Sequence, residues 1–240
     1  MSVYLEPLIE LLTVFALPAI FAITSHEAAH GLVANWLGDD SAKKMGRVTF
    51  NPLRHIDLLG TIVIPLVLLL PQLALPPESW LLFGYAKPVP VDLGQMRHPR
   101  RDMMLVTLAG PGTNIVIALV SALLVYFLPY IPSVAQMWAF RTLSASINFN
   151  MLIAVFNLIP LPPLDGGRFA LAALPDALAF PFARVERYGL FVLVGALILL
   201  PLLGRVLHIN LNLFRYVIGI PKDYMTQLVF WLTGFPAGFS

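Results

Sequence analysis

The chain has 240 residues, of which 58% are hydrophobic and only 12% are charged, and its formal net charge at pH 7 is +2. Soluble domains carry about 25% charged residues, so a water-soluble fold of this composition is excluded because it would expose large apolar patches. The small net charge excludes a nucleic-acid partner. There is no cysteine, which excludes disulfides and thiolate zinc sites, so any metal must be bound by His, Asp or Glu.

Apolar segments long enough to cross a lipid bilayer recur along the chain. A hydrocarbon core about 30 Å thick needs about 20 apolar helical residues. Segments of about this length run over Leu8–Leu37, Leu58–Leu75, Met103–Tyr130, Ala139–Ile159 and Tyr188–His208. We therefore predict an all-α polytopic membrane protein with five to six transmembrane helices.

The last apolar stretch, from Asn210 to Phe235, leaves the number of spans open. It contains Gly219 and Pro221, two residue types that interrupt helices. The stretch is therefore predicted to be either a sixth span or two interfacial segments.

The segment from Gly84 to Asp92 is not expected to be helical, because Pro88 and Pro90 are separated by a single residue. A proline favours extended backbone in the residue before it and is tolerated on an edge strand. A short re-entrant or extended strand of this kind can bind an unfolded peptide by strand addition. The residues alone allow an ordinary interhelical loop equally well.

The pentapeptide His-Glu-Ala-Ala-His, from His26 to His30, lies inside the first apolar segment. Residues i and i+4 share one face of a helix, so both imidazoles can reach one zinc ion at about 2.0–2.1 Å. Glu27 projects to the side of this pair, where its carboxylate can act as a general base on a water molecule. A chance sequence on an amphipathic helix is the alternative. Ionisable groups in a membrane helix are costly and need a compensating partner, so the pattern favours a metal site.

A catalytic zinc site has three protein ligands, so a third ligand must come from elsewhere in the chain. Asp165 follows an apolar helix broken by three prolines and precedes two glycines, and broken backbone at membrane depth lines an internal cavity. It could also cap the next helix. Residue chemistry alone places Asp165 only slightly ahead of His55. The full set of candidates is His55, Asp57, Asp92, His98 and Asp165.

Three motifs resemble those of the site-2 protease family of intramembrane zinc metalloproteases. They are His26-Glu-Ala-Ala-His30, Ala109-Gly-Pro-Gly-Thr-Asn114, and a late segment that begins Asn157-Leu-Ile-Pro160 and ends Leu164-Asp-Gly-Gly-Arg168. The stretches Gly38–Gly60 and Ala86–Pro90 resemble the compact bacterial branch of that family, which lacks a PDZ domain.

The resemblance implies a role for each residue of the motifs. It implies that His26, His30 and Asp165 bind one zinc ion per chain and that Glu27 activates water. It also implies that Asn157 positions the substrate or stabilises the oxyanion by donating an amide hydrogen.

The resemblance further favours the extended reading of the proline-rich segment, with an expected contact to substrate through Lys87, Pro88, Val89 and Pro90. A substrate contact is also expected from Asn114. For Asn114 and Asn157 alike, hydrogen bonding between helices is an equally weighted alternative.

His55 lies in a polar loop near the end of the first apolar segment. It could be an extra metal ligand, a gating residue or a loop histidine. We favour the loop histidine, since this residue type is often partly buried without a functional role.

The function implied is that of an intramembrane zinc-dependent endopeptidase, which hydrolyses peptide bonds in or near transmembrane segments of membrane-protein substrates. A non-catalytic zinc-containing membrane binding protein is one alternative, but it would have no use for the base Glu27. A metal or proton transporter is another, and it predicts ionisable residues along several helices. The second and fifth apolar segments contain few of them.

A single domain over residues 1–240 is expected, with a catalytic core at about residues 8–170 and C-terminal helices at about residues 188–235. As a multi-pass protein in contact with the lipid bilayer, it is expected in the cell membrane, specifically in the cytoplasmic membrane of a bacterium. No sensing domain is visible, so a partner that presents the substrate, or a homo-oligomer, is expected.

Overall fold

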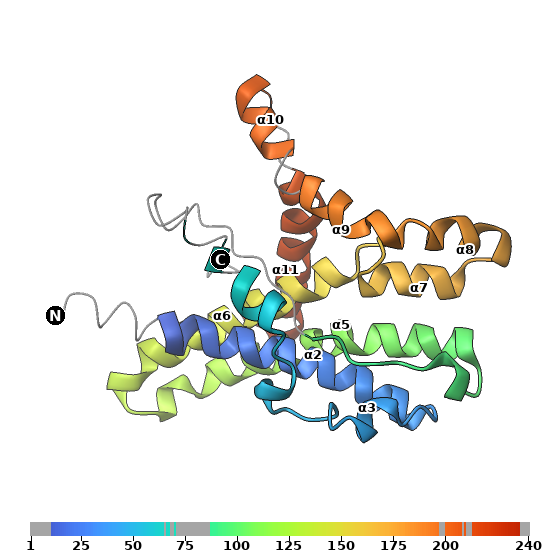
Figure 1. Ribbon diagram of the computed structural model, residues 1–240. Helices are drawn as coiled ribbons and strands as arrows, with labels where there is room; N and C mark the ends of the chain where they lie inside the picture. Colours follow the sequence, from blue (N-terminus) through green and yellow to red (C-terminus); the bar gives the residue numbers. More distant parts are fainter. Residues whose placement is uncertain are drawn as a thin grey trace.

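The computed structural model of the protein describes residues 11–64, 66–67, 70, 87–196, 200–207, 209 and 213–235. Within these ranges all regular structure is helical and no β-strand occurs (Figure 1). The all-α class is thereby confirmed for the part of the chain that is described.

Among the residues that the structure describes, three helical segments are long and apolar enough to cross a membrane. The first joins a π-helical stretch, Leu11–Ala16, to helix α2, Leu17–Trp36. The second joins helix α5, Pro99–Leu124, to a 3₁₀ extension that ends at Tyr130. The third is helix α6, Ser133–Asn157. These three helices lie at the first, third and fourth predicted positions, and each has the length and apolar composition that a membrane span requires.

Helix α5 is the central helix of the bundle, since it packs against α2, α6 and α7 (Figure 1). The helices approach closely because their facing residues are small, such as Ala22 of α2 and Ala118 of α5, both fully buried. Their outward faces carry large apolar residues, including Phe21 and Val116, which are exposed by 49% and 58%. In water such exposure would be unfavourable, whereas lipid is a suitable solvent for these side chains.

The main apolar core joins α5, α6 and α11. It consists of Ala118, Ala122, Ile147, Met151, Val229 and Phe230. A second cluster, formed by Ala34, Met96 and Val106, packs the end of α2 against α5 and the loop before it. The second cluster includes Ala34 of α2, the helix that carries His26 and His30, so this packing helps to fix the position of the predicted site.

Shorter helices complete the described chain. They are α3 (Ser41–Lys44), α7 (Asp165–Ala173), α8 (Asp176–Ala183), α9 (Glu186–Val194), α10 (Leu200–Leu207) and α11 (Ile220–Thr233), with single 3₁₀ turns at Pro52–Arg54 and Leu93–Gln95 and π-helical turns at Leu58–Val63 and Arg215–Gly219. Figure 1 shows α7 alongside α5, with α8 folded back on the far side of α7. The start of α7 reaches α2, where Asp165 contacts His26 and His30.

The other predicted spans are described only in part. The second, Leu58–Leu75, lies mostly outside the described residues, and the fifth, Tyr188–His208, is described on both sides of residues 197–199. In the last stretch, Gly219 and Pro221 do not interrupt the chain, which is helical from residue 213 to residue 233. Pro221 closely follows the π-helical turn Arg215–Gly219, where the regular i→i−4 hydrogen bonding is already altered, so the missing backbone N–H of proline is tolerated there.

Candidate metal centre

Helix α2 presents His26 and His30 on one face, one turn apart. Their rings meet edge to face with centroids 4.7 Å apart, and their Nε2 atoms are 3.1 Å apart. Both residues are buried, with exposed fractions of 4% and 8%. The i, i+4 spacing therefore produces the pair of converging imidazoles that the sequence predicts.

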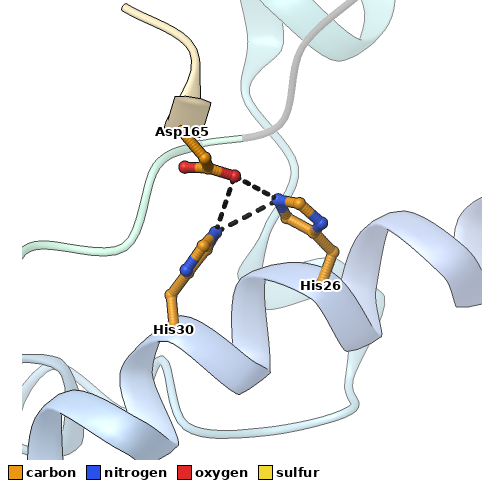
Figure 2. A group of neighbouring side chains, drawn as sticks. All are labelled: His26, His30 and Asp165. Atoms are coloured by element: carbon orange, nitrogen blue, oxygen red, sulfur yellow. Dashed lines mark hydrogen bonds and ion pairs between the residues drawn. The ribbon is translucent and has the colours of Figure 1, made fainter. Parts of the chain in front are cut away.

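Asp165, the first residue of α7, completes the group. Its Oδ2 atom lies 3.0 Å from His26 Nε2 and 3.2 Å from His30 Nε2. Figure 2 shows the carboxylate of Asp165 facing both rings. The two glycines after it are required by a close turn: a β-carbon at Gly166 would lie 2.3 Å from the carbonyl oxygen of Leu158, and one at Gly167 would lie 2.1 Å from Pro162 N. The segment from Leu158 to Asp165 thus folds tightly enough to bring the carboxylate of Asp165 next to both imidazoles.

The hydrogen bonds behind the rings show which nitrogen faces the centre. His30 Nδ1 lies 2.7 Å from the carbonyl oxygen of Val106, an acceptor, so Nδ1 is the protonated nitrogen and donates. His26 Nδ1 lies 2.6 Å from Asn114 Oδ1 and donates likewise. The Nε2 atoms of neutral rings then turn lone pairs toward Asp165 Oδ2.

Three electron-pair donors at such short distances repel one another unless a cation lies between them. Tetrahedral zinc with nitrogen and oxygen ligands separates those ligands by about 3.3 Å, close to the observed 3.0–3.2 Å. In the described residues, these three form the one group of His and carboxylate side chains whose ligand atoms all lie within 4.8 Å. The donor set therefore fits a zinc ion.

The charge of Asp165 suits this role. Burial raises the pKa of its carboxyl, but in the metal-free site a proton on Nε2 of His26 or His30 would be donated to it, and these contacts outweigh burial and hold that pKa well below its usual range. The carboxyl is consequently ionised at neutral pH and can act as an anionic ligand.

Glu27 lies beside the centre without belonging to it. Its side chain is half-buried, and its Oε2 atom accepts a hydrogen bond of 3.2 Å from the backbone N–H of Val89. It is absent from the group of converging ligand atoms. The carboxylate is thus available for proton transfer, as expected of a base.

The segment from Lys87 to Asp92 forms no regular structure, and it is attached to the protein at three backbone N–H groups. Lys87 donates to the carbonyl oxygen of His55 at 2.9 Å, Val89 donates to Glu27, and Asp92 donates to Asp39 Oδ2 at 2.7 Å. Val89 is buried, whereas Lys87 and Pro88 are exposed. The predicted contact segment therefore lies next to the predicted base, and residues 84–86 lie outside the described chain.

The two predicted asparagines occupy different environments. Asn157, the last residue of α6, is half-buried and donates to the carbonyl oxygen of Ile153 in its own helix at 3.1 Å. Asn114 is fully buried and contacts His26 from behind. The structure thus places the buried Asn114 behind the His26 ring, on the side opposite the Nε2 atom that faces Asp165.

The other candidates for a third ligand have structural contacts instead. His55 is buried and donates from Nε2 to the carbonyl oxygen of Thr49 at 2.9 Å, which agrees with a loop histidine. Asp57 caps the turn at Leu58–Val63 by accepting from Gly60 N. Hydrogen bonds from Gln95 and Gly94 hold the pKa of Asp92 below its usual value.

His98 precedes α5, and its backbone N–H donates to Asp102 Oδ2 at 2.8 Å. In the described chain it does not join the converging group. Of the five candidates for a third ligand, the structure brings Asp165 alone to the two helical histidines.

Comparisons with known proteins agree with this arrangement. Residues 130–200 match the family model described as Peptidase family M50, a range that includes Asn157 and Asp165. "Putative zinc metalloprotease YwhC" of Bacillus subtilis (strain 168) is 34% identical over 212 residues, which are 86% of this chain and 90% of that protein. "Putative zinc metalloprotease Rip2" of Mycolicibacterium smegmatis is 26% identical over 187 residues, covering 78% of this chain and 66% of that protein. No solved structure matches the chain.

Proposed function

Since the chain belongs to peptidase family M50, the zinc-dependent site-2 proteases of membranes, we propose that its reaction centre is the group of His26, His30 and Asp165, with Glu27 as the base. The protein is a zinc metalloprotease whose substrates are membrane proteins. The assignment of individual residues to steps of the reaction is our proposal.

The observation that carries the proposal is the convergence of His26 Nε2, His30 Nε2 and the carboxylate of Asp165 at one buried point beside Glu27, whose carboxylate does not belong to this group. Two of the three ligands come from a helix that is apolar enough to span a membrane. Burying such groups there is costly without a bound cation. A structural zinc site would need a fourth protein ligand, and the described residues supply three.

A zinc ion held by these ligands would supply Lewis acidity, which lowers the pKa of a water molecule and polarises a carbonyl group. Glu27 would take the proton from the attacking water and deliver it to the amine that leaves. The hydrogen bond from Val89 N to Glu27 Oε2 holds the carboxylate in place for both transfers. Asn157 would assist by donating its amide hydrogen to the developing oxyanion.

The substrate is proposed to bind in extended form along Lys87, Pro88, Val89 and Pro90. A helix shields its own carbonyl groups, so a transmembrane substrate must unwind before it can be cut. The proximity of this segment to Glu27 supports the idea that it holds the unwound peptide by strand addition. Helix-breaking residues near the cut would reduce the free energy of unwinding.

The finer architecture follows the same proposal. We propose five to six membrane spans within a single domain over residues 1–240, located in the cytoplasmic membrane of a bacterium. A partner protein or a second copy of the chain would present the substrate. The three spans that the structure describes support a multi-pass arrangement.

The test is cleavage of a membrane-spanning peptide by the purified protein in proteoliposomes. Glu27→Gln should bind one zinc per chain and lose cleavage by at least about 100-fold, in line with the contribution of a general base. Glu186→Gln, at an exposed helix start, should cleave like the wild type. Full cleavage by Glu27→Gln would remove the base from the mechanism, and zinc binding without any cleavage by wild type would favour the non-catalytic alternative.

A further inference from the structure

Behind His26, two buried asparagines link three helices. Asn114 of α5 accepts from His26 Nδ1 at 2.6 Å, while its Nδ2 donates to the carbonyl oxygen of Ala22 at 3.2 Å and to Asn150 Oδ1 at 2.8 Å. Asn150 belongs to α6 and, like Asn114, is fully buried. The Asn114 carboxamide therefore forms hydrogen bonds to α2 at the His26 ring and at the backbone of Ala22. A hydrogen bond to Asn150 of α6 fixes the position of that carboxamide.

The direction of these hydrogen bonds is fixed from one end. Asn150 Nδ2 lies 2.8 Å from the carbonyl oxygen of Ser146, which can only accept. The Oδ1 atom of Asn150 must then face Asn114, whose Nδ2 donates to it and to the carbonyl oxygen of Ala22. Asn114 Oδ1 is left as an acceptor for His26, so Nδ1 must be the donor.

The consequence reaches the metal site. A neutral imidazole protonated at Nδ1 has its lone pair at Nε2, the atom that lies 3.0 Å from Asp165 Oδ2. We propose that Asn114 and Asn150 form a positioning pair that sets the tautomer and orientation of His26 for zinc binding. This inference rests on the proposed function insofar as His26 is taken as a zinc ligand.

A purely structural role would explain some of these contacts, since amide pairs join membrane helices by hydrogen bonding. The bond to the ring of His26 distinguishes the two roles. Partners of this kind behind a metal-binding histidine typically change metal affinity 10- to 100-fold when they are removed. Asn114 would act by positioning His26 rather than by contacting substrate.

The experiment measures the zinc affinity of the purified full-length protein by competition with a chelator. Asn114→Leu should weaken zinc binding by about 10- to 100-fold, and Asn150→Leu should weaken it by about tenfold, because Asn114 keeps its contact but loses its support. Asn114→Asp keeps an oxygen for His26 Nδ1 and gives up both donated hydrogen bonds. Because it keeps the contact with the ring but loses its support from α2 and α6, as Asn150→Leu loses its support from α6, its loss of affinity should be close to that of Asn150→Leu and smaller than that of Asn114→Leu.

The matched control is Ser121→Ala, which removes a part-buried hydrogen bond of 2.8 Å between Ser121 of α5 and Ser146 of α6. This hydrogen bond does not involve His26. The zinc affinity of the control variant should be unchanged. The visible spectrum of bound Co²⁺ gives a second readout, which should change in Asn114→Leu and remain like that of the wild type in Ser121→Ala.

Two results would overturn the inference: zinc affinity and a Co²⁺ spectrum in Asn114→Leu that match the wild type, or equal loss of affinity in Asn114→Asp and Asn114→Leu. Thermal unfolding of the metal-free variants identifies any that fail to fold. If Asn114→Leu fails to fold, Asn150→Leu, which leaves Asn114 intact, tests the inference: wild-type zinc affinity in this variant would overturn it. An absence of zinc binding in folded wild-type protein would instead contradict the proposed function itself.

Discussion

Gly110 of α5 lies directly against His30 of α2: a β-carbon built on Gly110 would be 2.5 Å from His30 Nε2. The same β-carbon would be 2.6 Å from His26 Cε1 and Nε2. Helix α5 therefore passes over the Nε2 edge of both rings. At position 110 there is space for the hydrogen atoms of glycine but not for a β-carbon. The glycine allows the central helix of the bundle to cover one side of the proposed metal site.

Gly110→Ala should consequently weaken zinc binding while leaving the bundle folded. The added methyl group must displace one ring or the helix, and overpacking of this kind costs about 1–3 kcal/mol. We expect a loss in zinc affinity of at least about tenfold, with cleavage reduced in parallel. Gly112→Ala is the matched control, because a β-carbon there meets no atom within 4 Å. Equal zinc affinity in the two variants would show that the rings tolerate the methyl group.

Removal of single ligands tests the metal centre directly. Wild-type protein should contain one zinc per chain, whereas His30→Ala and Asp165→Ala should lose most of it, since either change leaves two ligands where three are needed. His55→Ala should keep its zinc, because His55 hydrogen-bonds to the loop at Thr49. Elemental analysis of detergent-purified protein checks these values. If Asp165→Ala retained its zinc and His55→Ala lost it, His55 rather than Asp165 would be the third zinc ligand.

The sequence predicts part of the site because helical geometry is local. The spacing of His26 and His30 is sufficient to place two rings on one face of a helix. Asp165 is 139 positions from His26, and residue chemistry alone barely separates it from His55. The motif resemblance singles it out. Which distant side chain reaches a site depends on helix packing, which no local pattern encodes.

The residues behind the site show the same limit. Asn150 stands within a predicted apolar segment, and a buried amide in a membrane helix is a signal of function or helix contact. Its partner could not be inferred, because the pairing of α5 with α6 is a tertiary property. The carbonyl oxygen of Val106, which accepts from His30, left no signal at all, since every residue has such a group.

Helix ends were predicted less accurately than helix cores. Helix α5 begins at Pro99 rather than at about Met103, and α6 begins at Ser133 rather than at about Ala139. Hydropathy detects the part of a helix that lies in hydrocarbon, while the helix itself continues into the polar interface. At the start of α5, the buried carboxylate of Asp102 accepts from His98 N and stabilises the additional turn.

Asp39 should stabilise the attachment of the segment from Lys87 to Asp92 to the rest of the protein. Its side chain is fully buried and accepts hydrogen bonds from Ser41 N at 2.9 Å and Asp92 N at 2.7 Å. Asp39→Ala leaves both N–H groups without this partner and should destabilise the protein by about 1–3 kcal/mol. Asp40→Ala removes a surface ion pair with Lys44 and should cost at most about 1 kcal/mol. Denaturation monitored by circular dichroism measures both, and equal stabilities would exclude an attachment role for Asp39.

The backbone N–H of Val89 should matter for catalysis because it donates to the proposed base Glu27. Val89→Pro removes this donor and keeps the extended backbone that proline favours, so Glu27 loses the bond that orients it. Hydrogen bonds to charged groups contribute about 1.5–3 kcal/mol, and we expect at least about a tenfold decrease in kcat. Zinc content should be unchanged, since neither residue belongs to the metal-binding group.

Val89 is also buried and packs against α2, where a β-carbon on Gly31 would lie 3.3 Å from Val89 Cγ1. Val89→Ala therefore serves as the control, because it removes that packing and keeps the N–H group. If the hydrogen bond orients the base, kcat in Val89→Pro should fall well below that in Val89→Ala. Equal kcat values in the two variants would assign the effect to lost packing, and the base would then owe its orientation to groups other than this backbone donor.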